Sequence, residues 1–86
     1  MNVSNNIDIE KDKDVHHPEH YISETGLEAI DVIRAFTFDL VGVEAVATGN
    51  ILKYTCRWKK KNGIKDLKKA KWYLDYLINH LEKLAE

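Results

Sequence analysis

Apolar side chains recur every three or four positions along most of the chain after residue 26, which is the spacing of α-helices. The first such segment, residues 27–36, predicts a helix with one buried side. The residues expected on that side are Ala29, Ile30, Ile33 and Phe36. Thr25 and Glu28 match a capping box, in which the two side chains bond N–H groups at the helix start. Residues 36–42 are apolar and end in a glycine, so we expect a tight, buried connector, with a short strand as the alternative.

A second helix is expected over residues 43–61. One of its sides carries Ala47, Ile51, Tyr54 and Trp58. The Asn62-Gly63 pair then predicts a helix stop, because both residues tolerate left-handed backbone. A third helix is expected to follow, and its apolar seam has the 3-4-3-4-3 spacing of a heptad repeat: Leu67, Ala70, Leu74, Leu77, Leu81 and Leu84. The short link predicts an antiparallel hairpin, so the fold class is all-α, a three-helix unit.

The length of 86 residues allows one domain. Residues 1–14 are polar and charged, so we expect a disordered tail followed by a single domain over residues 15–86. A core of about 70 residues supplies only a few kcal/mol, and the single cysteine, Cys56, excludes a disulfide within the chain. We therefore expect a homo-oligomer. No apolar run is long enough to span a membrane, and no signal peptide is visible, which predicts a cytoplasmic protein without a membrane partner.

Charge is distributed unevenly, although the formal net charge is only −1. Residues 1–31 hold eight acidic residues against two lysines, and residues 53–71 hold nine basic residues against Asp66 alone. Such asymmetry indicates either a bound anion or an internal contact between acidic and basic groups.

A basic side of the second helix is the first candidate site. Asn50, Lys53 and Arg57 are spaced so that they share one side of that helix, and Lys61 extends it. Arginine binds phosphate with two hydrogen bonds and lysine contributes a point charge, so this side predicts phosphate binding. More lysines follow the turn, where the start of the third helix adds partial positive charge. The alternative is that the lysines form a solvated helix surface.

Histidines before the first helix are the second candidate. His16, His17 and His20 lie close together in sequence, next to Tyr21. They could bind a metal, contact a phosphate or base, or act as a general acid or base, but the spacing matches no standard zinc signature, so no metal is predicted. Alternatively, Pro18 and Tyr21 only pin this segment to the helices.

Carboxylates and aromatic residues complete the candidates. Glu28 is expected as the capping acid, and Asp31 is expected to pair with Arg34 or with a base on the second helix. The aromatic residues that could stack on a base are Tyr54, Trp58, Trp72 and Tyr73, of which Tyr54 and Trp72 are expected in the core. Cys56 is expected to be structural, and His80 to lie at the surface. The chain lacks the glycine-rich phosphate-binding motifs.

Taken together, four motifs resemble a family of small bacteriophage proteins, called SaV-like, that includes the nucleotide kinase of some podophages. The motifs are HHPEHY at 16–21, GLEAIDVI at 26–33, GNILKYTCRWKKK at 49–61 and KDLKKAKWYLDYLI at 65–78. The resemblance implies a phage protein in the host bacterial cytoplasm that acts on deoxynucleoside monophosphates without a P-loop. If it is a kinase, ATP with Mg²⁺ is the implied donor. The matching positions are His17, His20, Tyr21, Glu28, Asp31, Asn50, Lys53, Tyr54, Arg57 and Asp66.

The favoured interpretation is a phage protein that binds a nucleotide through its phosphates and is similar to a nucleotide kinase. Family members described as kinases are longer than this chain, so one alternative is a non-catalytic sponge that sequesters a nucleotide signal of host defence. Another is a protein-interaction module whose heptad helix binds a host protein. The slightly negative net charge and the acidic N-terminal segment disfavour nucleic acid as a partner.

Overall fold

The computed structural model describes residues 22–86, and this part of the chain is helical. It contains α3 (Ala29–Thr37), α4 (Gly42–Arg57) and α5 (Ile64–Ala85), with a short 3-10 helix, η2 (Trp58–Lys60), after α4. The only β-type pairing in this range is an isolated bridge between Ile22 and Glu28. The predicted all-α, three-helix fold with a helical hairpin is confirmed. The tail predicted for residues 1–14 lies outside the described residues.

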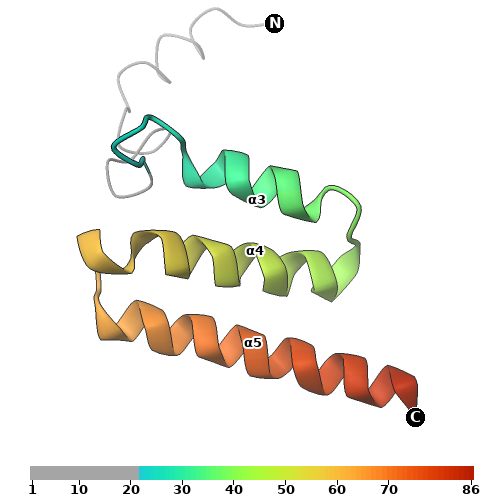
Figure 1. Cartoon of the computed structure of the whole chain (residues 1–86). Helices are drawn as coiled ribbons and strands as arrows, with labels where there is room; N and C mark the ends of the chain where they lie inside the picture. Colours follow the sequence, from blue (N-terminus) through green and yellow to red (C-terminus); the bar gives the residue numbers. More distant parts are fainter. Residues whose placement is uncertain (1–21) are drawn as a thin grey trace, which may run out of the picture.

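The three helices lie side by side, with α4 between α3 and α5 (Figure 1). Consecutive helices run in opposite directions, because each connection is short. The α3–α4 contact is close at Gly49, where an added Cβ would lie 3.4 Å from Cγ2 of Ile33. Among the described helices, each outer helix therefore packs mainly against α4.

The core of the described part is correspondingly small. Its buried hydrophobic residues are three alanines, Ala29, Ala47 and Ala70. Burial of Ala29 was predicted, but the prediction was wrong for Ile30 and Phe36, whose side chains are 61% and 66% exposed. The physical reason is that, among the described helices, α3 packs mainly against α4, so only a narrow stripe of α3 is covered.

A turn, rather than a capping box, precedes α3. The Thr25 hydroxyl bonds the Ser23 hydroxyl at 2.8 Å, and Glu28 itself occupies the N-cap position without a side-chain cap bond. The N–H of Gly26 donates to the Ser23 carbonyl at 2.9 Å, and Gly26 has a φ of 85°, which favours glycine. The predicted capping box is therefore wrong, because α3 begins only at Ala29 and the Thr25 hydroxyl is bonded within the preceding turn.

The segments that connect the helices are more exposed to solvent than predicted. The α3–α4 connector is short as expected but not buried, since Phe38 and Val41 are 82% and 79% exposed. Trp58, predicted on the buried side of the second helix, is 40% exposed. The α-helix ends at Arg57, and the tighter winding of η2 turns Trp58 away from the α-helical register. The predicted helix stop at Asn62-Gly63 is confirmed, with Gly63 at a φ of 58°.

On α5, the side that is covered differs from the heptad seam. The more buried positions of this helix are Asp66, Ala70, Tyr73, Leu77 and His80. Leu67, Leu74 and Leu81 are 38%, 45% and 46% exposed, so the seam prediction is correct only for Ala70 and Leu77. The bond between Asp66 and Arg57 favours this rotation, because it holds the start of α5 with Asp66 toward α4. A stripe of leucines is left at the surface.

Candidate functional site

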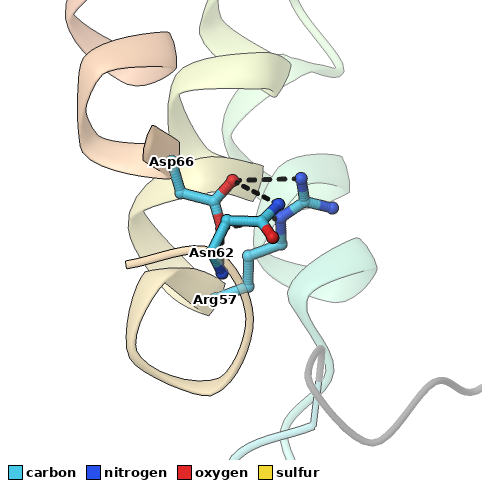
Figure 2. Close-up of polar contacts among 3 residues, drawn as sticks. All are labelled: Arg57, Asn62 and Asp66. Atoms are coloured by element: carbon cyan, nitrogen blue, oxygen red, sulfur yellow. Dashed lines mark hydrogen bonds and ion pairs between the residues drawn. The ribbon is translucent and has the colours of Figure 1, made fainter. Parts of the chain in front are cut away.

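A buried ion pair closes the α4–α5 hairpin (Figure 2). Arg57, the last residue of α4, donates from Nε to Oδ2 of Asp66 and from Nη2 to Oδ1, each at 3.2 Å. Asn62, in the turn, donates its backbone N–H to Oδ2 at 3.3 Å and its side-chain amide to Oδ1 at 3.4 Å. Arg57 is 5% exposed and Asp66 is fully buried. The internal contact between acidic and basic groups, one of the two explanations for the charge asymmetry, is thus present.

The environment of Asp66 keeps its carboxylate ionised. Burial by itself would raise the pKa of this group, but the hydrogen bonds from Arg57 and Asn62, together with the Arg57 charge, lower it below its ordinary value of 3.8. The carboxylate therefore remains charged at neutral pH and balances the Arg57 guanidinium.

Acidification should weaken the fold through this group. Because the pKa of Asp66 is lower in the folded chain than in the unfolded chain, its contribution to stability is complete above about pH 4 and is lost as the pH falls through the folded-state value. At neutral pH the wild type should melt at a higher temperature than Asp66→Asn. Thermal unfolding between pH 7 and pH 2 should show this difference in melting temperature disappearing below about pH 4. Asp39→Asn, which removes an exposed carboxylate of the α3–α4 connector, is the control. A difference in melting temperature that stays constant down to pH 2 would contradict a stabilising role for the ionised Asp66 carboxylate.

Three cationic side chains surround the ring of Tyr54 on α4. The Nζ atoms of Lys53 and Lys69 lie 4.6 Å and 5.5 Å from the ring centroid, and the Arg57 guanidinium carbon lies 4.8 Å from it. Arg57 is balanced by Asp66. Within residues 22–86, neither Lys53 nor Lys69 forms an ion pair with a carboxylate. Two uncompensated positive charges therefore converge on one aromatic ring.

An open recess of about 330 Å³ lies beside this cluster, between α4 and α5. Its walls are Tyr54, Lys69, Trp72 and Tyr73. The rings of Tyr54 and Tyr73 stack with centroids 6.1 Å apart, which joins the two helices at the floor of the recess. We call this arrangement the Tyr54 recess. Its chemistry suits an anionic ligand that also presents a flat or apolar surface.

The structure brings together four of the predicted site residues: Lys53, Tyr54, Arg57 and Asp66. Asn50 is half-buried on the same helix, and its amide donates to the Val46 carbonyl at 2.9 Å. Lys61 is exposed beyond η2, and its backbone N–H donates to the Trp58 carbonyl at 3.4 Å.

Other predicted residues lie away from this cluster or outside the described range. Glu28 precedes α3 and Asp31 lies in its first turn. The expected ion pair between Asp31 and Arg34, or with a base on α4, is absent among residues 22–86. His16, His17, His20 and Tyr21 lie outside the described residues. In the part of the chain that the structure covers, no three histidine, cysteine or acidic side chains are grouped to hold a metal ion.

Sequence reasoning missed Lys69 as a site residue and assigned Trp72, one of the residues that could stack on a base, to the core. Trp72 was predicted in the core but is 61% exposed, because α5 turns its Tyr73 side toward α4. Lys69 is one of the lysines that follow the turn, and it was not assigned to the site. The available signal was spacing, since Lys69, Trp72 and Tyr76 recur at three and four residues and so share a side of α5. Cys56 is exposed, and His80 is half-buried against the Tyr76 ring.

The described helices and this recess define a small helical-hairpin protein with a cationic, aromatic surface site. None of the described helices combines the length and apolar character needed to cross a membrane. By comparison with known proteins, the chain belongs to the family described as a protein of unknown function, DUF3310, whose model matches residues 15–75.

A relative from a bacteriophage supports phage origin for the chain. The Gene 1.7 protein of Enterobacteria phage T3 is 42% identical over 72 residues, which cover 78% of this chain. The matched part is 43% of that relative's length, so the chain spans less than half of it. No solved structure matches the chain. The resemblance to a phage family is confirmed by these matches.

Proposed function

We propose that this phage protein binds a nucleotide through its phosphates at the Tyr54 recess. The observation that carries the proposal is the convergence of Lys53 and Lys69 on the Tyr54 ring, with no described carboxylate partner for either lysine. Two ammonium groups held near one another repel, and a phosphate between them would relieve that repulsion. Arg57 adds to the local charge less than the lysines, because Asp66 balances it within the fold.

The family resemblance supports a kinase-like protein of the deoxynucleoside monophosphate class. In that case Lys53 and Lys69 would stabilise the phosphoryl group during transfer, and the contribution of the chain would be mainly positioning and electrostatics. Asn50 and Lys61 would extend the phosphate contacts, and His17, His20 and Tyr21 would close the site or contact the base. Bound ATP with Mg²⁺ would supply the phosphoryl group. The same recess also suits a sponge that binds a nucleotide without turnover.

The test is thermal melting of the full chain against nucleoside mono-, di- and triphosphates and cyclic dinucleotides. A bound nucleotide at a hundred times its dissociation constant should stabilise the protein by about 2.7 kcal/mol. Lys53→Met and Lys69→Met should each weaken binding about tenfold, because each removes a charge-assisted contact worth about 1.5 kcal/mol. Lys59→Met, which removes an exposed lysine of η2 outside the Tyr54 cluster, should bind normally.

A panel without any melting shift would overturn nucleotide binding. Equal weakening by Lys59→Met would show general charge attraction rather than a site. Incubation of the bound monophosphate with ATP and Mg²⁺ then separates the two functions. Formation of the diphosphate identifies a kinase, and tight binding without product identifies a sponge.

We also propose that α5 joins two copies of the chain through its exposed apolar side. That side, here called the leucine stripe, consists of Leu67, Leu74, Ile78 and Leu81, which are 38–46% exposed. It lies away from the Tyr54 recess, because Trp72 and Tyr76 are each two residues from Leu74 and so project from the opposite side of the helix. Assembly through the leucine stripe would therefore leave the recess open.

Charges beside the leucine stripe favour a second copy in antiparallel orientation. Lys68 and Lys71 flank its first half, and Asp75 and Glu82 flank its second half. Two antiparallel copies related by a two-fold axis near Leu74 place the lysines of one beside the acids of the other. A parallel pair would instead place like charges together. A host protein on this stripe is the alternative outcome.

A further inference from the structure

The Tyr54 recess adjoins a second recess between α4 and α5. This second recess has a volume of about 240 Å³ and is lined by Val43, Val46, Ala47, Trp72, Tyr73 and Tyr76. Trp72 and Tyr73 line both recesses, so the two share a wall. Small-molecule sites usually occupy about 300–1,000 Å³, and the second recess alone falls below that range. Together they are large enough for one small ligand.

The two recesses differ in chemistry. The Tyr54 recess has Lys69 in its wall and the Lys53 ammonium over its aromatic ring. All the side chains that line the second recess are apolar or aromatic, and none of them is charged. A ligand that spans both recesses would therefore be anionic at one end and flat and apolar at the other, as a mononucleotide is.

Trp72 is an exposed ring that its neighbours hold in place. It stacks on Tyr76 with centroids 5.8 Å apart at 18°, and it meets Tyr73 edge-on at 5.0 Å. Tyr76 in turn stacks on His80 at 6.5 Å. A ring that is 61% exposed yet fixed on one side is a preorganised surface for stacking a nucleobase.

We propose that the second recess holds the nucleobase, stacked on Trp72 and packed against Val46, while the phosphates lie at Lys53 and Lys69. The proposal rests on nucleotide binding at the Tyr54 recess and adds Trp72, Tyr76 and Val46 as the residues that contact the base. It also predicts that the base and the phosphates of the ligand contribute to binding separately. A ligand without a base should use only the lysines.

The test uses the two tryptophans of the chain. Trp58→Phe leaves Trp72 as the only tryptophan, and this variant is titrated with the four deoxynucleoside monophosphates and with pyrophosphate. Monophosphates should quench Trp72 fluorescence by stacking on it, and pyrophosphate should leave the fluorescence nearly unchanged. In calorimetry, Trp72→Ala should weaken monophosphate binding by about fivefold to a hundredfold and leave pyrophosphate binding as in the wild type.

Val46→Phe, which fills the second recess, should also weaken the binding of monophosphates and leave the binding of pyrophosphate unchanged. Trp58→Ala is the matched control and should leave the affinity for both ligands unchanged. If monophosphates bind but Trp72→Ala and Val46→Phe have no effect, the base site is wrong and nucleotide binding at the lysines stands. If Trp72→Ala weakens both ligands equally, the base site is also wrong. If neither monophosphates nor pyrophosphate bind, nucleotide binding itself fails.

Discussion

Replacing Arg57 with methionine is expected to lower the melting temperature by about 12 °C or more. The change leaves the Asp66 carboxylate buried without its cation, and removal of one partner from a buried ion pair costs about 3–5 kcal/mol. In a domain of this size each kcal/mol moves the melting temperature by about 4–8 °C. Circular dichroism during heating measures the effect. Lys59→Met, which removes an exposed cation of η2, should melt near the wild type.

A double variant separates loss of the ion pair from simple loss of packing. Arg57→Met combined with Asp66→Leu removes both charges, and an apolar pair often replaces a buried ion pair at little or no cost. We expect the double variant to recover most of the melting temperature that Arg57→Met loses. If Arg57→Met melts like the wild type, the pair does not hold the hairpin. For the same reason, loss of binding in an Arg57 variant would not separate a ligand contact from unfolding, and the lysines are the better test.

Replacing Leu74 with glutamate is expected to convert an assembled protein into a monomer. In an antiparallel pair, Leu74 lies near the two-fold axis and meets the partner's Leu74, so the variant would bury two like charges at the centre of the contact. A buried, unpaired charge costs about 3 kcal/mol or more, which raises the dissociation constant more than a hundredfold. Sedimentation velocity over a range of protein concentrations measures this change. Phe38→Glu alters an 82% exposed residue away from the leucine stripe and should leave assembly unchanged.

Charge reversal tests whether the two copies of α5 are antiparallel. Lys68→Glu with Lys71→Glu should weaken assembly, because the new acids would meet the partner's acids. Adding Asp75→Lys and Glu82→Lys reverses every flanking charge and should restore assembly, since the antiparallel pattern is complementary again. A wild-type chain that sediments as a monomer at every concentration would rule out self-association through the leucine stripe. The stripe would then remain as a surface for a host protein.

Parts of the candidate site were accessible from sequence because they lie within one helix. Lys53 and Arg57 are four residues apart, and helical spacing alone places them on one side of α4. The contribution of α5 was not accessible in the same way. Lys69 reaches the Tyr54 ring only because α5 packs against α4 in one particular rotation. Sequence spacing could not distinguish that rotation from the one in which the leucines face α4.

The sequence by itself determined where the helices lie and where they stop. Apolar spacing located α4 and α5, and Gly63 supplied the positive φ that ends the hairpin turn, since these are local properties of the chain. Only the tertiary structure decided which sides are buried. Arg57 and Asp66 are nine residues apart, and their pairing turns Ala70 and Tyr73 toward α4, which leaves Leu74 and Trp72 on opposite exposed sides of α5. Which side of each helix is buried depends on the free energy of contact between two helices. The periodicity of one helix carries no information about that free energy.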